Sequence, residues 1–301
     1  MPDLNNISLD PWNHPEFRKN ELNIEVLRLD KIHPDISGNK WYKLKYFLER
    51  GRNEDKRNLV SFGGAYSNHL LALSAAAGIN GFSSIGYIRG EKPGQLSHTL
   101  LKATRYGMEL RFLSRPDYDK KKKSAAENPE VENEPDALLI PEGGVGTDGI
   151  RGAEEILSAL SLNRYTHICC AVGTGTTMMG IINSAGDNQS IIGVSVLKGT
   201  RGFEPLNIFK LKNPERLKNI QMIHSDHFGG YAKKNQSLID FMNRTFDQSG
   251  IPTDFVYTGK LFFSVFRMAI EKAFPNGSRV LILHSGGLQG NHSLAPGLLQ
   301  F

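Results

Sequence analysis

The sequence has few cysteines, few tryptophans and no long apolar run. Of its 301 residues, two are cysteine and two are tryptophan. Cys169 and Cys170 are adjacent within one apolar segment, which argues against the disulfide framework of a small secreted protein. No segment approaches the ~20 consecutive apolar residues of a membrane-spanning helix. The first residues mix acids with bases and lack the apolar centre of a secretory signal, so we expect a cytoplasmic protein without a membrane partner.

Dense clustering of positive charge is also missing. The net charge is +5, but apart from a run at Lys120–Lys123 the basic residues are scattered. Acidic residues follow that run closely, at Glu127, Glu130, Glu132, Glu134 and Asp136. A solvated surface explains this pattern better than a nucleic-acid site, since no nucleic-acid-binding motif accompanies it. We therefore expect no nucleic-acid partner and no metal site, whereas mild basicity suits a small anionic ligand.

The sequence does contain a regular alternation of apolar, β-branched segments with helix-like segments. Strands are predicted at 24–29, 59–62, 84–88, 110–113, 167–172, 191–196, 222–224 and 280–284. Helices are predicted at 66–77, 95–106, 152–160, 177–184, 234–246 and 261–273. This alternation predicts an α/β fold with mostly parallel strands and helices on both faces. The polar segment 114–136 is predicted to be a surface excursion that contains a helical stretch.

One loop has the composition of an anion site. Gly173, Thr174, Gly175, Thr176 and Thr177 follow an apolar strand and precede a helix, and ligands of open parallel sheets bind beyond the carboxyl ends of strands. Glycines let backbone N–H groups converge, hydroxyls add donors, and a helix N-terminus adds positive potential, which together suit a phosphate. The loop matches neither the dinucleotide fingerprint nor a Walker loop. A tight turn without a ligand is the alternative.

A second loop carries polar groups at a comparable position. Ser67, Asn68 and His69 follow a predicted strand and two glycines, and they precede an Ala-rich helix. A hydroxyl, an amide and first-turn N–H groups predict a cradle for a carboxylate. Capping of the helix by Ser67, within an ordinary polar turn, is the alternative.

Lysine and tyrosine side chains supply further candidates. Lys40, in the loop-like segment 37–46, becomes a nucleophile if burial lowers its pKa, and is otherwise a solvated charge. Ser285 follows a buried-looking strand and precedes two glycines. Tyr257 opens a predicted helix, where anchoring the core to the surface is the simpler role.

Taken together and in order, these segments resemble the D-cysteine desulfhydrase and 1-aminocyclopropane-1-carboxylate deaminase family of pyridoxal-phosphate enzymes. The resemblance covers most of the chain. It implies the tryptophan-synthase-β-like fold (fold type II) of two open, mostly parallel α/β domains, with pyridoxal 5′-phosphate as cofactor. It implies a large domain at 1–45 and 146–301, a small domain at 46–145, and the active site between them. The segments 141–144 and 152–155 resemble the family's return crossover to the large domain. We also expect a homodimer.

The resemblance implies a role for each cofactor-binding candidate. Lys40 would bind the cofactor covalently, and the loop of Gly173 to Thr177 would bind its phosphate. Asn68 would contact the 3-hydroxyl, and His69 would flank the ring. Ser285 would lie beside the pyridine nitrogen, where a neutral hydroxyl leaves the ring a weaker electron acceptor than a carboxylate would.

The remaining roles concern the substrate, a small amino acid. Ser67 and Asn68 would bind its carboxylate. Lys40 is the first candidate base for the α-proton, with Tyr257 as the catalytic tyrosine on the other face. Tyr231 is its expected companion. Tyr66 stands where the family usually has Gln, so it is expected to reshape the substrate site.

Two positions bear on the reaction. Ring-opening deaminases of the family carry Glu after the catalytic tyrosine, whereas this chain has Thr258. Ser285 resembles the Thr of the desulfhydrases. Both favour β-elimination from D-cysteine, which gives a 2-oxo acid, ammonia and sulfide. The alternatives are deamination of 1-aminocyclopropane-1-carboxylate, a dehydratase or racemase of the same fold, and a two-domain small-molecule binding protein without catalysis.

Overall fold

The computed structural model describes residues 2–127, 134–158, 160–202 and 211–301. The strands are β1 Leu9–Pro11, β2 Asn23–Arg28, β3 Asn58–Gly63, β4 Ser83–Arg89, β5 Met108–Leu113, β6 Ala137–Leu139, β7 His167–Val172, β8 Ser190–Ser195, β9 Ile220–Ile223 and β10 Arg279–His284. The α-helices are α1 Pro15–Lys19, α2 Asn39–Asn53, α3 Asn68–Ile79, α4 His98–Arg105, α5 Arg115–Glu127, α6 Thr147–Glu154, α7 Thr176–Ser184, α8 Gln236–Ser249 and α9 Thr258–Ile270.

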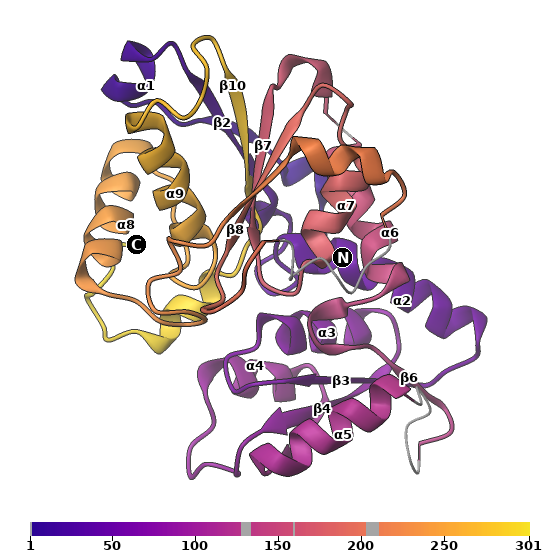
Figure 1. Ribbon diagram of the computed structural model, residues 1–301. Coiled ribbons are helices and arrows are strands. Elements are labelled where there is room, and N and C mark those ends of the chain that lie inside the picture. The colour runs from indigo at the N-terminus through magenta and orange to yellow at the C-terminus, as the bar shows by residue number, and fades with distance from the viewer. Residues whose placement is uncertain (1, 128–133, 159, 203–210) are drawn as a thin grey trace.

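These strands form two sheets (Figure 1). The six-stranded sheet has the order β1-β2-β10-β7-β8-β9, and the four-stranded sheet has the order β5-β4-β3-β6. Only β1 pairs in the antiparallel sense among the described strands. The predicted α/β class with mostly parallel sheets is therefore confirmed. Since parallel strands point the same way, the loops after β2, β7 and β10 lie at one edge of the larger sheet.

Helices bury both faces of the larger sheet. Figure 1 shows α8 and α9 on one side of it and α6 and α7 on the other. In β10, Leu281 and Leu283 pack into the core that includes α7, whereas Val280 and Ile282 pack into the core that includes α9. Burial on both faces explains why these strands read as continuous apolar runs. The two cysteines of β7 are free, and they point into opposite cores.

The smaller sheet is also covered on both faces. Apolar side chains of α2, α3 and α4 pack on one face. On the other face, Tyr118 of α5 is buried against Phe62 of β3. The surface excursion predicted for 114–136 thus contains a helix that helps bury the sheet. Glu130 and Glu132 of the acidic stretch lie outside the described residues.

The lysine segment, which we predicted to be a loop, contributes residues 39–46 to helix α2. Leu44, Phe47 and Leu48 of this helix are buried at the three- and four-residue spacing of a helix face. Charged neighbours such as Lys45 and Glu49 hide this pattern in the sequence. Lys40 consequently lies in the first turn of a helix, which restricts where its side chain can point.

The bounds predicted for the helix at 152–160 were wrong. Helix α6 ends at Glu154, and a single 3-10 turn, Glu155–Leu157, follows it. A Cβ atom on Gly152 would lie 1.7 Å from the backbone oxygen of Tyr42, and one on Gly149 would lie 2.0 Å from that of Gly144. These glycines lower helix propensity, but Gly152 allows α6 to approach α2 closely and Gly149 allows it to approach the preceding turn at Gly144. Tertiary packing therefore overrides the local signal.

Two kinds of feature are absent from the described ranges. No helix there has both the length and the apolar character needed to cross a membrane. No group of three or more His, Cys, Asp or Glu side chains there has an arrangement that would hold a metal ion.

Candidate active site

Lys40 lies where two backbone segments meet. Gly38, just before α2, has a φ of 65°, and a Cβ atom there would lie 2.0 Å from the backbone oxygen of Ser285. The N–H of Asn39 donates to that oxygen at 3.3 Å. Only glycine permits so close an approach. The order Gly-Asn-Lys therefore places Lys40 beside the end of β10.

The surroundings of Lys40 favour its neutral amine. Nζ donates to Oδ1 of Asn39 at 2.8 Å and lies 5.8 Å from the centre of the Tyr257 ring. Asn39 in turn donates to Oγ1 of Thr177 at 2.7 Å. Burial lowers the pKa of Lys40 to about 8, and the negative charge of Asp254 opposes the shift only in part. A partly unprotonated lysine is able to attack a carbonyl carbon near neutral pH.

The predicted phosphate loop follows β7 and leads into α7. Gly175, before the helix, has a φ of 81°, and Thr176 and Thr177 are buried in its first turn. A Cβ atom on Gly173 would lie 3.1 Å from Cε1 of Tyr257, so a side chain there would crowd the ring. The first N–H groups of a helix have no partner within it, and they attract anions. This geometry suits a phosphate group.

Lys43, which sequence analysis did not single out, adds a second amine at the same place. It is buried, and its Nζ donates to the backbone oxygen of Gly143 at 3.1 Å. A Cβ atom on Gly143 would lie 2.9 Å from Cγ2 of Thr174, so the two segments are adjacent. Burial, together with the charge of Lys40, holds the pKa of Lys43 well below its usual range. A helical interpretation of the segment would have revealed it, because residues three apart share a helix face.

Ser67 and Asn68 begin α3, beyond the end of β3. Oγ of Ser67 accepts the N–H of Leu70 at 3.2 Å, so Ser67 does cap the helix. Nδ2 of Asn68 lies 3.5 Å from the backbone oxygen of Gly287, which follows the strand β10 of the other sheet. Oδ1 of Asn68 is buried without a hydrogen-bond partner among the described residues. Buried polar atoms are normally paired, so this oxygen marks a place where a bound molecule would complete the hydrogen bonding.

His69 is buried in an uncharged state. Its Nε2 lies 2.9 Å from Oγ of Ser61, and its Nδ1 has no hydrogen-bond partner in the described part of the chain. Burial and the charges of Lys40 and Lys43 lower the pKa of His69 to about 3. The ring is therefore neutral at physiological pH. Tyr66, before the helix, is 51% exposed.

The two tyrosines of the resemblance lie together. The rings of Tyr257 and Tyr231 pack edge to face, with centres 5.9 Å apart. Tyr231 is 48% exposed as a whole, but the protein around its hydroxyl raises the pKa of that group, and burial raises the pKa of Tyr257. The neighbouring Tyr231 raises the pKa of Tyr257 further. Both are therefore phenols near neutral pH and able to donate a proton.

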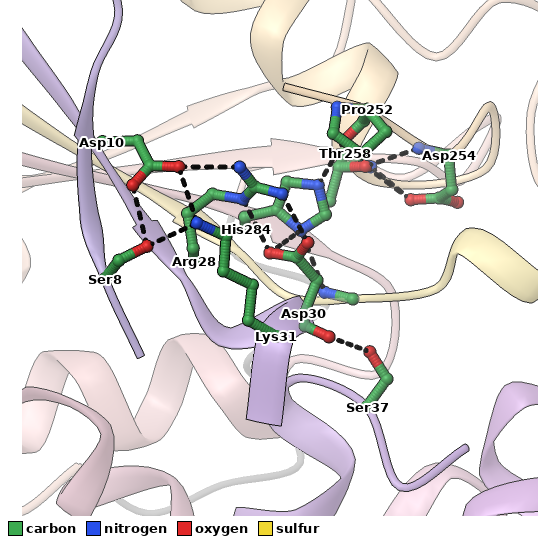
Figure 2. Close-up of polar contacts among 11 residues, drawn as sticks. Ser8, Asp10, Arg28, Asp30, Lys31, Ser37, Pro252, Asp254, Thr258 and His284 are labelled. Carbon is green, nitrogen blue, oxygen red and sulfur yellow. Dashed lines mark hydrogen bonds and ion pairs between the residues drawn. The ribbon is translucent and has the colours of Figure 1, made fainter. Parts of the chain in front are cut away.

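A buried carboxylate, also not singled out in the sequence, holds the segment before Tyr257. Asp254 has no exposed surface. Its two oxygens accept the N–H groups of Val256, Tyr257 and Thr258 at 2.8–2.9 Å and the Thr258 hydroxyl at 2.7 Å. Figure 2 shows the pair of Asp254 and Thr258. Since Thr258 is itself fully buried, its hydroxyl reaches Asp254 rather than a substrate.

A second buried polar network surrounds His284 at the end of β10 (Figure 2). Nδ1 of His284 lies 3.1 Å from Asp30, and Nε2 lies 2.6 Å from the backbone oxygen of Pro252. Arg28 binds Asp30 through two nitrogens, at 2.7 and 2.9 Å. Burial alone would raise the pKa of Asp30, but His284 and Arg28 outweigh it and lower the pKa. The network fixes the ends of β2 and β10, next to Gly38 and Ser285.

Most candidates from the sequence thus lie in loops or first helical turns that follow strands of the two sheets, and Tyr257 lies just before α9. The chain is similar to known proteins over most of its length. A Pyrococcus abyssi protein assigned as a 1-aminocyclopropane-1-carboxylate deaminase is 30% identical over 308 residues, which cover 94% of this chain and 92% of that protein. A mitochondrial bifunctional D-cysteine desulfhydrase/1-aminocyclopropane-1-carboxylate deaminase from Arabidopsis thaliana is 25% identical over 93% of this chain and 75% of its own.

Solved structures agree as well. The crystal structure of an ACC deaminase homologue matches with a TM-score of 0.74 at 23% identity, over 97% of this chain and 93% of that chain. This match confirms the fold that the sequence predicts. Residues 14–286 match the family described as pyridoxal-phosphate dependent enzyme. The chain therefore belongs to the pyridoxal-phosphate dependent enzyme family.

Proposed function

We propose that this enzyme eliminates the β-substituent of a small D-amino acid, with D-cysteine as the first candidate substrate. The reaction converts D-cysteine and water into pyruvate, ammonia and hydrogen sulfide. The observation that carries the proposal is the position of the Lys40 amine. It lies in the turn linked to the phosphate loop through Asn39 and Thr177, and 5.8 Å from the Tyr257 ring.

The residues present fit pyridoxal phosphate. The cofactor needs an amine for its aldehyde, donors and positive charge for its phosphate, and polar groups around its ring. Lys40 supplies the amine, and the first turn of α7 with Lys43 supplies the phosphate site. The orphaned Oδ1 of Asn68 and Nδ1 of His69 are buried polar atoms available to a ring substituent.

We assign the cofactor-binding roles accordingly. Lys40 would bind the aldehyde carbon, while Gly173–Thr177 and Lys43 would bind the phosphate. Asn68 would contact the 3-hydroxyl, His69 would flank the ring, and Ser285 would lie by the pyridine nitrogen. When bound, the cofactor supplies an electron-accepting ring that stabilises the negative charge left by loss of the α-proton.

The chain's own groups then bind the substrate and move protons. The N-terminus of α3, with Ser67 and Asn68, holds the substrate carboxylate, because helix N-termini favour anions. Lys40 takes the α-proton at Nζ, because its pKa, lowered to about 8, leaves a fraction of the amine unprotonated near neutral pH. Tyr257, a phenol at that pH, donates a proton to the departing sulfur. The ring of Tyr231 packs edge to face against that of Tyr257 and supports this transfer.

The choice of substrate rests on Ser285, Thr258 and Tyr66. A hydroxyl such as that of Ser285 would not keep the pyridine nitrogen protonated as a carboxyl group would. The ring would then be a weaker electron acceptor, which favours rapid loss of a leaving group. Thr258 supplies no second carboxylate beside Asp254. Tyr66, half exposed, replaces a polar amide near the carboxylate cradle, and an altered polar group changes substrate class more strongly than a methylene does.

The second candidate is ring opening of 1-aminocyclopropane-1-carboxylate, favoured by the likeness to the Pyrococcus abyssi and Arabidopsis thaliana proteins. Sulfide from D-cysteine and 2-oxobutyrate from the cyclopropane acid should be measured with one preparation. We expect sulfide alone. Ring opening without sulfide would overturn the proposal, as would keto-acid release only from another member of a D- and L-amino-acid panel. That last result would indicate a dehydratase. Conversion of an amino acid into its mirror-image form, without keto-acid release, would indicate a racemase.

We further propose that the two sheets belong to two domains, with the large domain at 1–45 and 146–301 and the small one at 46–145. Strands β3 to β6 all fall within the small range. The boundary at residue 45 lies within α2, whose Tyr42 packs with the larger sheet and whose Phe47 packs with the smaller one. A homodimer and a cytoplasmic location complete the proposal, and light scattering of the purified protein tests the dimer.

A further inference from the structure

The loop that carries Tyr231 has a strained backbone. Phe228 and Ala232 have φ values of 51° and 52°, and Gly229 and Gly230 between them have 93° and 111°. Residues with a Cβ atom adopt this left-handed region at a cost. Such conformations persist only where surrounding contacts enforce them, and they gather at functional sites. The contacts that enforce this loop should therefore also decide where Tyr231 lies.

One of those contacts is a buried lysine. The Lys260 side chain has no exposed surface, and its Nζ donates to the backbone oxygens of His227 and Gly230 at 2.8 and 2.7 Å. No ion pair joins it to a carboxylate within the described ranges. Burial lowers its pKa to about 8, against the opposing charge of Asp254. Since burying an amine is costly unless hydrogen bonds offset it, the two loop carbonyls account for its place.

The same helix holds the start of the loop. Ser264 donates to Oδ2 of Asp226 at 2.8 Å, and Arg267 donates to that oxygen at 3.0 and 3.2 Å. Lys260, Ser264 and Arg267 are spaced by four and three residues, so they lie on one face of α9. Tyr257 immediately precedes this helix. Helix α9 thus follows directly on Tyr257 and also holds the loop of Tyr231 through hydrogen bonds.

We propose that Lys260 is a positioning residue that sets the place of Tyr231 relative to Tyr257. The inference rests on the roles proposed above for the two tyrosines, but the contact itself does not depend on bound cofactor. Lys260 touches neither ring's reacting hydroxyl; it acts through the carbonyls on either side of Phe228 and Gly229. Removing its ammonium group frees those carbonyls and releases the loop from α9.

The test compares Lys260→Met with Lys218→Met, the same change at an exposed lysine just before β9. Both variants are prepared without cofactor and with 3-fluorotyrosine, and the signals of Tyr231 and Tyr257 are assigned through Tyr231→Phe and Tyr257→Phe. We expect fluorine NMR to show a shifted or broadened Tyr231 signal in Lys260→Met only. With cofactor, kcat should fall roughly tenfold or more while KM changes little, as for a misplaced catalytic group.

An unchanged Tyr231 signal in a folded Lys260→Met protein would overturn the inference. If that variant does not fold, Ser264→Ala removes the hydrogen bond from α9 to Asp226 at the start of the loop. It should move the Tyr231 signal by a smaller amount, and an unmoved Tyr231 signal in this variant would also overturn the inference. A displaced Tyr231 signal with unchanged kcat would support positioning by Lys260, while contradicting the catalytic role of Tyr231 instead.

Discussion

Asn39 and Thr177 are 138 residues apart in the sequence and share a buried hydrogen bond of 2.7 Å. One precedes the lysine proposed to bind the cofactor, and the other lies in the turn proposed to bind its phosphate. The bond therefore links the first turns of α2 and α7, which carry the groups proposed to bind the aldehyde and the phosphate. The proposed site thus rests on the ends of rigid helices rather than on free loops.

Lys40→Ala should abolish both the absorbance of lysine-bound cofactor and turnover, with little loss of fold. The reason is that no other group would bond to the aldehyde carbon. Absorbance spectra and keto-acid release measure the two effects, and Lys45→Ala on the same helix is the control. A borohydride-reducible chromophore in Lys40→Ala would show that another lysine binds the cofactor.

Lys43→Met should weaken cofactor binding by roughly 10- to 100-fold, because a hydrogen bond to a charged group contributes about 1.5–3 kcal/mol. Fluorescence titration of the cofactor-free protein measures the change. Pyridoxal, which lacks the phosphate, should bind both proteins equally. An equal loss for pyridoxal and for its phosphate would place Lys43 away from the phosphate group.

The reactivity of Lys40 in the cofactor-free protein should depend on pH near neutrality. Its pKa is lowered to about 8, so the unprotonated fraction rises about tenfold per pH unit up to that value and then levels off. An ordinary lysine would continue to rise to ~10.4. Labelling by a neutral aldehyde with cyanoborohydride, followed by mass spectrometry of the Lys40 peptide, gives the profile. Levelling only above pH 10 would mean that burial does not act on this amine.

Asp254→Asn should move that profile to lower pH, because the charge of Asp254 raises the pKa of Lys40. The change also weakens four hydrogen bonds to the start of α9, so we expect a loss of stability of about 1–3 kcal/mol. Urea unfolding and the same labelling experiment measure both. A profile that does not move, in a protein that has lost stability, would leave Asp254 with a purely structural role.

Ser285→Asp should increase protonation of the pyridine nitrogen and shift the products from elimination toward transamination. A carboxylate at this position would hold a proton on the ring, which then retains the electrons for longer. Product analysis and the absorbance spectrum measure the shift, and Ser285→Thr is the conservative control. Unchanged spectra and product ratios in the folded Asp variant would show that residue 285 does not lie beside the pyridine nitrogen.

The sequence alone determined the α/β class, most strands and the candidate loops, because these depend on local signals. Continuous apolar runs report burial on both faces, and a cluster of Gly, Thr or Ser after a strand reports a turn where ligands bind. The resemblance to a family, which the match of residues 14–286 confirms, added the identity of the cofactor, pyridoxal phosphate.

Only the tertiary structure decided which charged groups are buried and what they face. Lys43, Asp254 and Lys260 look like ordinary charged residues in the sequence. Their burial follows from contacts with segments such as Gly143 and Gly230, far along the chain. Helix α2 escaped prediction for the same reason: its apolar face packs on the cores of two sheets at once. Desolvation and long-range packing set these features, and both exist only once the chain has folded.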